Sequence, residues 1–220
     1  LDAGWVPAFP SGAHTFSAVG VSTNTGYLYV TQRGNASIPP VLVLNANGEL
    51  VATWGENDIA VDRSVPPAAT WGAHGLTVED SGWNIAEDCR QGGHEGDVRT
   101  RIFIEDFTNH TVTGFCSTSG QRLFQMGTPG LAGNGTAPIQ FGNVADAAVE
   151  TSPTATGSSF LYTSDGDGGT ANRVMKIKMS SSSGASSSSS FPSVVWATPA
   201  VFDNPHSIAL HLRSGILVVA

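Results

Sequence analysis

The sequence predicts an all-β fold. Its apolar runs are short and are separated by turn-forming Gly, Asn, Asp and Ser residues, and long amphipathic helical patterns are absent. The chain has 26 glycines and 12 prolines, which interrupt regular elements too often for long helices. With 40% hydrophobic and 13% charged residues, it is able to form the core of one domain and is not expected to be disordered throughout.

A unit of four short apolar segments recurs along the chain. In the clearest copy, which starts at His74, the segments are HGLTVED, RIFIEDF, HTVTGFC and RLFQMG. The first copy starts at Phe16 and has FSAVGVS, GYLYVTQ, PPVLVLN and ELVATWG. The third starts at Ala145 with ADAAVE, SSFLYTSD, NRVMKIKM and VVWATPA, and a fourth starts at His206 with HSIALHL and SGILVVA. Each segment predicts one strand, so the chain contains three four-strand units and the start of a fourth.

Repeated four-strand units are typical of β-propellers, in which each blade is a small antiparallel sheet that packs face to face on its neighbours. A closed ring needs at least four blades, so this chain predicts an incomplete propeller. Exposed blade faces and strand edges favour association. We therefore expect the packing to be completed by a continuation of the chain, by protein partners or by further copies of the chain.

The repeats divide the chain into an N-terminal extension, residues 1–15, and the blades, residues 16–220. Two stretches interrupt the blades. Residues 84–100 form an insertion in the second unit, and the serine-rich residues 180–190 form a flexible surface loop.

Charge and hydropathy exclude two kinds of partner. The net charge of -8 disfavours binding to nucleic acid and to anionic lipid surfaces. No apolar run is long enough to predict a membrane span. The N-terminus, LDAGWVPAFP, lacks both an initiator Met and a signal-type apolar segment, which suggests a mature chain or a fragment.

Sequons and cysteines indicate a secreted or extracellular protein. N-glycans are predicted at Asn35, Asn109 and Asn134, although short sequons also arise by chance in a chain rich in Ser and Thr. The two cysteines, Cys89 and Cys116, predict one disulfide that would link the insertion to a core strand. The alternative is a pair of free buried thiols.

The segment IFIEDFTNHTVTGFCSTSGQRLFQMG resembles an NHL repeat. Asn109 and His110 stand where the Asn-His of the repeat commonly falls, and Thr111 replaces its leucine. The resemblance covers most of the chain from about Phe16 and implies an NHL-type β-propeller. Two branches of this family are similar to the chain: the lyase domain of the peptide-amidating enzymes, and secreted NHL-repeat proteins of unestablished function.

The resemblance to the lyases implies metal sites. Histidines that open the innermost strands hold the lyases' zinc, and His74 and His206 stand at matching positions, where Phe16 and Ala145 are the equivalents in the other two units. Equivalent inner-strand positions converge on the channel, so distant histidines can share one ion. A third zinc ligand is then expected from a blade beyond the end of this chain. Leu76 matches a position whose backbone carbonyl is associated with calcium. The alternative is that both histidines are ordinary channel residues bonded to the backbone.

Two further features bear on the lyase resemblance. Arg33 is similar to an arginine that grips the substrate carboxylate, a task suited to the guanidinium fork, although it could also fix a surface turn. The lyases' catalytic tyrosine lies in an SDGYxNSR-like segment, whereas this chain reads SDGDGGTANR from Ser164. The phenolic base is therefore absent, and the loop resembles that of the secreted NHL-repeat proteins instead.

The remaining titratable residues are given structural or weaker roles. Asp165 and Asp167 are calcium candidates because alternate carboxylates in a loop can wrap a hard cation, although a plain glycine-rich turn is the simpler reading. Asp106 and Asp165 end the second strands of their units and are expected to bond the turns. The other histidines are expected to be structural or exposed; they are His14, His94, His110 and His211.

These observations favour an extracellular binding or structural module rather than an enzyme. The alternative is a zinc-dependent lyase that cleaves a peptidyl-hydroxyglycine into an amide and glyoxylate, with His74 and His206 as ligands and Arg33 as the substrate clamp. The sequence contains no G-x-S-x-G elbow, phosphate-binding loop, HExxH or CxxC pattern, so hydrolase, nucleotide-binding and dithiol chemistry have no support.

Overall fold

The computed structural model describes residues 6–62, 69–80, 100–117, 119–151, 159–179 and 192–220. Several predicted features fall outside these ranges: the serine-rich loop 180–190, Cys89, His94 and all of the insertion 84–100 except Thr100, which begins a strand. None of the described residues forms a helix that could cross a membrane.

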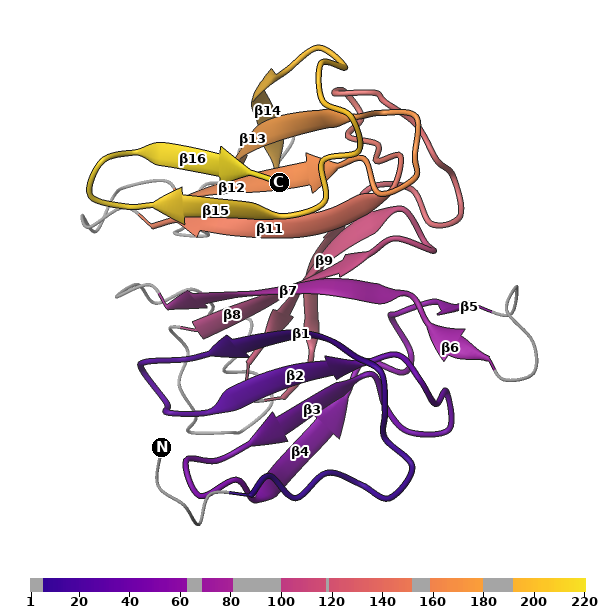
Figure 1. The fold of residues 1–220 in the computed structure, drawn as a ribbon, viewed down its shortest axis with the longest axis vertical. Helices are drawn as coiled ribbons and strands as arrows, with labels where there is room; N and C mark the ends of the chain where they lie inside the picture. The colour runs from indigo at the N-terminus through magenta and orange to yellow at the C-terminus, as the bar shows by residue number, and fades with distance from the viewer. Residues whose placement is uncertain (1–5, 63–68, 81–99, 118, 152–158, 180–191) are drawn as a thin grey trace, which may run out of the picture.

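Three four-stranded antiparallel sheets and one two-stranded sheet make up most of the described chain (Figure 1). The first sheet has β1 (Phe16–Val21), β2 (Leu28–Gln32), β3 (Val41–Leu44) and β4 (Leu50–Trp54). The second has β7 (Ala73–Asp80), β8 (Thr100–Asp106), β9 (Thr111–Cys116) and β10 (Arg122–Met126). The third has β11 (Val144–Glu150), β12 (Ser159–Asp165), β13 (Arg173–Met179) and β14 (Ser193–Ala197), and β15 (Ile208–His211) pairs with β16 (Ile216–Val219). The described strands form separate blades and no closed barrel, which confirms the predicted fold class.

A small sheet between the first two blades was not predicted. Strands β5 (Val61–Asp62) and β6 (Thr70–Trp71) pair antiparallel and project to one side of the stack in Figure 1. Two residues are too few to show an alternating pattern in a sequence. The buried Trp71 ties this sheet to the first blade, because its indole Nε1 donates to the carbonyl of Ile38 at 2.7 Å.

The first strands of the blades lie side by side, in the order β1, β7, β11 and β15 (Figure 1). In each of the first three, the pairing with the second strand shifts by one residue near the start of the strand. The extra residues are Ser17, His74 and Ala145. A bulge of this kind re-aims one side chain. Ser17 is therefore the equivalent of His74 in the first blade, and the prediction of Phe16 was wrong by one residue because the sequence did not reveal the bulge.

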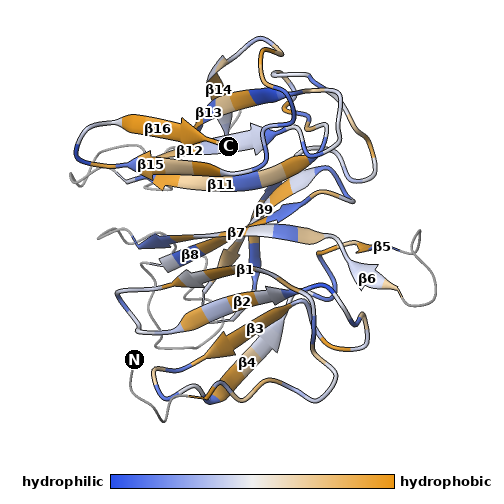
Figure 2. Ribbon diagram, in the orientation of Figure 1, coloured by the Kyte–Doolittle hydropathy of each residue, from blue (hydrophilic) through white to orange (hydrophobic). Residues whose placement is uncertain are grey.

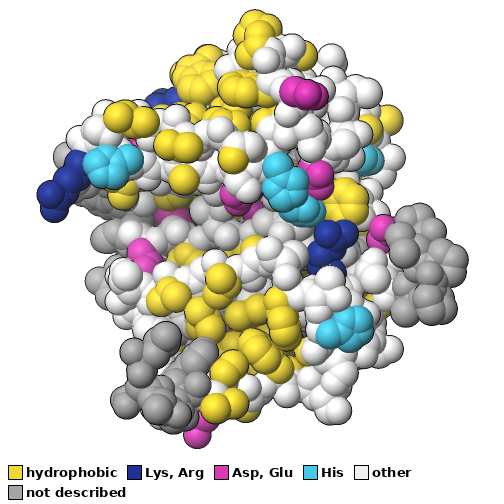
Figure 3. Space-filling view, in the orientation of Figure 1, with side chains coloured by type: hydrophobic (Ala, Val, Ile, Leu, Met, Phe, Trp, Pro, Cys, Tyr) yellow, Lys and Arg dark blue, Asp and Glu magenta, His cyan; other side chains and the backbone are white. Residues whose placement is uncertain are grey.

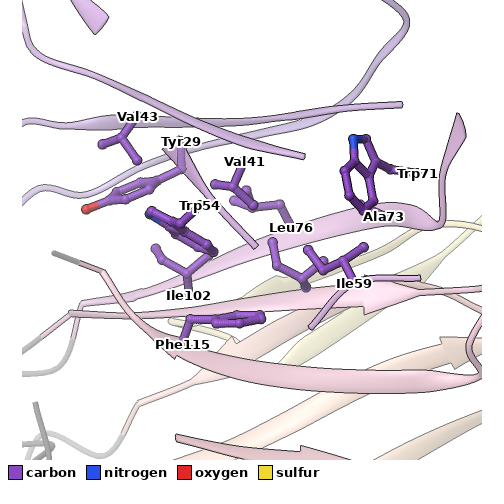
Figure 4. Packing of buried hydrophobic residues seen from close by; sticks show 11 residues of the cluster. Tyr29, Val41, Val43, Trp54, Ile59, Trp71, Ala73, Leu76, Ile102 and Phe115 are labelled. Carbon is purple, nitrogen blue, oxygen red and sulfur yellow. The ribbon is translucent and has the colours of Figure 1, made fainter. Parts of the chain in front are cut away.

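Apolar side chains hold the blades together. Tyr29, Val41 and Val43 of the first sheet share one buried cluster with Ile102 and Phe115 of the second (Figure 4). A second cluster joins the second and third sheets, and a third joins the third sheet to β15 and β16. Full burial of one such side chain stabilises a fold by about 1.5–3 kcal/mol, so these interfaces account for much of the stability of the stack. The strands that are hydrophobic along their whole length include β3, which is buried, and β16, which is not (Figure 2).

A buried polar residue ends the second strand of each of the three complete blades: Gln32, Asp106 and Asp165. Asp106 accepts hydrogen bonds from the backbone N–H of Ala60 at 2.7 Å and of Asn109 at 2.9 Å. Asp165 accepts from the N–H of Gly142 at 2.7 Å and pairs with Arg173 at 3.2 Å. Burial raises the pKa of both carboxyl groups to about 6. These contacts are those of residues that fix turns.

Candidate functional site

His74, Asp167 and His206 converge at one point beside the inner strands. The Nε2 atom of His74 lies 3.2 Å from Oδ2 of Asp167, and Nε2 of His206 lies 3.9 Å from Oδ1 of the same carboxylate. The two imidazole rings are 4.8 Å apart at their centroids. One nitrogen or oxygen atom from each residue lies within 4.8 Å of the others, as in a group that could share a metal ion. Figure 3 shows histidine, acidic and basic side chains next to one another to the right of the centre of this face, between the levels of β11 and β7.

The three side chains come from three different places in the fold. His74 is the bulge residue of β7, and His206 directly precedes β15, two residues before Ile208. Asp167 lies in the loop that follows β12. Because β7, β11 and β15 are neighbours, residues far apart in the sequence meet at the same end of the inner strands.

The loop that carries Asp167 is held on both sides. Asn143 donates from Nδ2 to the carbonyl of Asp167 at 2.8 Å, and its own carbonyl accepts from the N–H of Asp167 at 3.1 Å. Asn204, from the segment that leads to β15, accepts from the N–H of Gly168 at 2.6 Å. The carboxylate is therefore placed by a structured turn.

His74 is oriented by the backbone of the next blade. Its Nδ1 lies 3.0 Å from the carbonyl oxygen of Ala145, which can only accept, so Nδ1 carries the proton. The other nitrogen, Nε2, then faces Asp167. Burial lowers the pKa of His74, which favours the neutral ring.

Arg33 lies close to this group. Its Nε donates to the carbonyl of Trp71 at 3.1 Å, and its guanidinium lies over the ring of Phe107 at 4.7 Å from the centroid. The same ring meets His74 edge-on, with centroids 5.7 Å apart. Burial lowers the pKa of Arg33 from a normally very high value, while the charges of Asp62 and Asp167 oppose that shift. A guanidinium is charged at neutral pH, so Arg33 forms a cationic side of the site.

A pocket of about 260 Å³ adjoins the histidines. Equivalent positions of the inner strands line it, including Ser17, His74, Ala145 and His206. Asp146 also lines the pocket, and burial raises the pKa of its carboxyl group. The Asp146 oxygens accept from the N–H groups of Ala147 at 2.9 Å and Ile208 at 3.1 Å, so this carboxylate links the third blade to β15.

The other predicted metal candidates are not part of the His74–Asp167–His206 group. Leu76 is 7% exposed on β7, packs in the first core cluster and lines the pocket. Asp165 directs its carboxylate to Arg173 and Gly142. Three further histidines bond to near or backbone partners outside the group: His14 to Thr15, His110 to the carbonyl of Gly142, and His211 to Ser214.

The predicted sites of modification differ in accessibility. Asn134 is exposed, whereas Asn35 and Asn109 are partly buried. The Asn35 side chain also donates to the carbonyl of Gly12 at 3.3 Å. Cys116 is buried on β9. The Cys89–Cys116 disulfide stays a prediction because Cys89 lies outside the described residues.

From the sequence, Asp167 was predicted to bind calcium together with Asp165. The third ligand of a zinc ion held by the two histidines was predicted to come from another blade. The structure instead places Asp167 with the two histidines. The available signal was its position: Asp167 occupies the place of the missing tyrosine in SDGDGG. The full burial of Glu105 beside Gly75 was not predicted, because β8 has polar residues at both ends and its sequence does not distinguish a buried carboxyl from an exposed one.

Antiparallel four-stranded blades, stacked with their first strands around a shared pocket, define a β-propeller-type module. No family model matches the chain. The chain is 30% identical over 224 residues to NHL repeat-containing protein 3 of Mus musculus and 29% identical over 218 residues to NHL repeat-containing protein 3 of Homo sapiens. The chain therefore resembles the NHL-repeat proteins, as its repeats predicted. Each alignment covers 96% of this chain and 50% of the relative, so the chain spans about half the length of these relatives.

A search of solved structures gives a weaker likeness. An auxiliary nutrient binding protein from Bacteroides ovatus ATCC 8483 matches 96% of this chain and 57% of that chain, with a TM-score of 0.44 and 10% sequence identity.

Proposed function

We propose that this chain is a secreted, N-glycosylated NHL-type module that binds proteins by packing blades onto its open sheet faces. The observation that supports this proposal is a difference in solvent exposure between equivalent positions of β7 and β1. Leu76 and Val78 on β7 pack against the first sheet, and Leu76 is 7% exposed. Their counterparts on β1, Val19 and Val21, are 62% and 58% exposed.

The face on β1 and β2 has the form of a docking surface. A groove of about 340 Å³ is lined by Phe9, Phe16, Val19, Leu28 and Val30, together with neighbouring small residues. Yellow side chains gather over this part of the molecule in Figure 3. Since the same positions of the second and third blades pack on a preceding blade, the natural occupant of this groove is another NHL blade.

The opposite end of the stack offers the complementary face. Ile208 and Leu217 pack on Tyr162 of the third blade. On the other side of the same two strands, Ile216 and Val218 are 59% and 58% exposed. One face of each kind is open, so blades from the same polypeptide or from another copy can extend the stack at both ends.

Covalent cross-linking tests this proposal. Cysteine pairs placed at Val19 and Val218, after replacement of the native cysteines, should form dimers between copies because the two faces meet. Pairs placed at Val19 and Val201 should not form such dimers. Val201 is exposed, but it does not lie on a blade face that the repeat alignment defines. Equal cross-linking of both pairs would show that the contact is not specific and would refute the proposal.

Secretion and glycosylation are tested separately. The protein produced in a eukaryotic secretory host should carry a glycan at Asn134, the exposed sequon, and lose mass on treatment with a glycosidase that removes N-glycans. Asn134→Gln should abolish that mass difference. A medium without the protein, or an unmodified Asn134, would contradict this part of the proposal.

A zinc-dependent lyase is the second candidate function. The observation that favours it is the approach of His74 and His206 beside Arg33. Asp167 stands where the lyases carry their catalytic tyrosine, so the protein has no phenolic base at that position. Release of glyoxylate from a peptidyl-hydroxyglycine in the presence of zinc would support the lyase function. If no glyoxylate is released, the lyase function is ruled out.

A further inference from the structure

We propose that Asn134 is a site of spontaneous deamidation, at which the side-chain amide becomes a carboxylate through a cyclic imide formed with Gly135. This inference is independent of the assembly proposed above, and only the protection by a glycan rests on the proposed glycosylation. Two Asn-Gly pairs occur in the chain, Asn47–Gly48 and Asn134–Gly135. Glycine favours the reaction because it has no Cβ to hinder the approach of its nitrogen to the preceding side chain. The structure distinguishes the two pairs.

The reaction needs no reactant other than water. The backbone nitrogen of Gly135 loses its proton and attacks the side-chain carbonyl carbon of Asn134. The side-chain nitrogen takes up a proton and leaves as ammonia. Water then opens the five-membered imide at either carbonyl, which gives isoaspartate when the main-chain carbonyl is opened and aspartate when the side-chain carbonyl is opened. The net change replaces NH2 by OH and, after ionisation, adds a negative charge.

The surroundings of Asn134 leave both reacting groups available. Asn134 lies in the loop between β10 and β11, and its side chain is exposed to water. The N–H of Gly135 donates to the side-chain oxygen Oε1 of Gln140 at 3.3 Å. This hydrogen bond is long and its acceptor is a side chain, so the nitrogen of Gly135 is weakly held.

Asn47 provides a control inside the same chain. It is also exposed, but Gly48 is buried and its N–H donates to the backbone carbonyl of Asn45 at 2.9 Å. The side-chain oxygen of Asn45 accepts from the N–H groups of Asn47 at 2.9 Å and of Glu49 at 3.1 Å. This turn holds the nitrogen that would attack, so the turn must open before Asn47 can react.

Arg173 makes the Asn134–Gly135 peptide more reactive. Its guanidinium donates to the main-chain carbonyl of Asn134, to that of Gln140 at 2.7 Å, and to the carboxylate of Asp165 at 3.2 Å. A hydrogen bond from a cation is strong and withdraws electrons from the peptide bond, so the N–H of Gly135 loses its proton more easily. Isoaspartate at position 134 would carry that carbonyl oxygen in its free carboxylate, which Arg173 is placed to hold. We therefore assign Arg173 as a positioning residue.

A glycan at Asn134 would prevent the reaction. Asn134, Gly135 and Thr136 form the sequon, so a glycan would be attached to the same nitrogen that leaves during deamidation. The sugar hinders attack on the amide and would have to leave together with the nitrogen. Asn134 therefore has two alternative fates, a glycan or a carboxylate.

Peptide mapping by mass spectrometry tests the proposal on Thr136→Ala, produced in a eukaryotic secretory host and incubated at mildly alkaline pH. This variant loses the sequon but keeps the Asn-Gly pair, and Thr136 is exposed. We expect Asn134 to gain the mass of the NH2-to-OH exchange about tenfold faster than Asn47, whose turn must first give up a hydrogen bond. In urea, which unfolds both turns, the two rates should be similar. Equal rates in the folded protein, or no reaction at Asn134, would overturn the proposal.

The unmodified protein separates this proposal from that of glycosylation. When glycosylated, Asn134 should keep its amide over the same period, and deamidation at the rate of Thr136→Ala would refute the protection. When Asn134 carries no glycan, the proposed glycosylation fails, but Asn134 should still react as in Thr136→Ala.

Arg173→Lys tests the positioning residue. It keeps a positive charge beside Asp165 but removes the guanidinium fork. We expect slower deamidation at Asn134 and an unchanged rate at Asn47, in a variant that circular dichroism shows to be folded. A substitution that only loosened the loop would accelerate the reaction at Asn134, so a faster or an unchanged rate would overturn the role of Arg173.

Discussion

Glu105 is an acidic residue that is fully buried in the core. It lies on β8 with no exposed surface, and neither carboxyl oxygen has a hydrogen-bond partner among the residues that the structure describes. Desolvation raises its pKa well above the usual value, and the charge of Asp146 adds to the effect. A carboxyl in such a place costs free energy when it ionises.

Replacing Glu105 should stabilise the protein at neutral pH. The folded-state pKa is raised, so the contribution of this group to stability is present below its ordinary pKa of 4.5 and is lost as pH rises toward the folded value. Glu105→Met removes the buried polar group at similar volume. We expect the free energy of unfolding at pH 7 to rise by about 1–3 kcal/mol and its decline with pH to be smaller, as measured by urea denaturation.

Glu79 provides the contrasting case. It is also buried, but its carboxylate pairs with Arg101 at 2.5 Å. Glu79→Met would leave the Arg101 guanidinium buried without its partner, so a loss of about 3–5 kcal/mol is expected. If both substitutions lower the free energy of unfolding by the same amount, the lack of a hydrogen-bond partner does not make Glu105 unfavourable for stability.

Gly75 lies on β7 opposite Glu105, at a position with no room for a larger side chain. A Cβ atom at this position would lie 2.5 Å from a carboxyl oxygen of Glu105 and 2.7 Å from the carbonyl oxygen of Ala145. The carbonyl belongs to the backbone and cannot move aside. Gly75→Ala should therefore destabilise the protein by about 1–3 kcal/mol, whereas Gly130→Ala, with open space around it but a positive φ, should lower stability by a smaller amount through backbone strain alone.

At the scale of elements, the blade depends on the turn after its second strand. Both carboxylate oxygens of Asp106 accept backbone hydrogen bonds, one from Ala60 and one from Asn109. The bond from Ala60 connects the second blade to the segment that precedes it, and the bond from Asn109 fixes the turn between β8 and β9.

Asp106→Asn should weaken this connection. The amide nitrogen of Asn donates and would face one of the two N–H donors, so we expect a loss of about 1–3 kcal/mol at pH 7. The pKa of Asp106 is raised from 3.8 to about 6, and its contribution to stability declines as pH rises through that range. The deficit of the variant should therefore be larger at pH 4 than at pH 7 in thermal or urea unfolding, and a deficit that grows with pH would refute this assignment.

The strands of the blades were predictable because each apolar run is bounded by turn residues and the pattern repeats. The bulges were not, since one additional residue changes the pairing without changing the hydropathy pattern, and Phe16 was chosen in place of Ser17 for that reason. For the site, the repeat alignment identified His74 and His206. The participation of Asp167 depends on the path of a loop held by Asn143 and Asn204, which spacing in the sequence does not specify.

In the whole molecule, the same packing arrangement accounts for the buried faces between blades and for the exposed apolar face of the first blade. Each blade presents the apolar side chains of its first two strands to the preceding blade, as Leu76 and Ile104 do toward the first sheet. The first sheet has Val19 and Val30 at the matching positions; both line the groove, and Val19 is 62% exposed. We therefore expect the 220-residue chain to associate through this face.

The most direct test is the mass of the unglycosylated 220-residue chain in solution, by light scattering over a range of concentrations. The prediction is a mass of at least twice the 22.7 kDa of one chain for the unmodified chain. Val19→Lys should lower the mass toward that of one chain, while Val201→Lys, at a comparably exposed valine away from the groove, should not. A mass of 22.7 kDa for the unmodified chain at every concentration would contradict the claim that the open blade faces bind further blades.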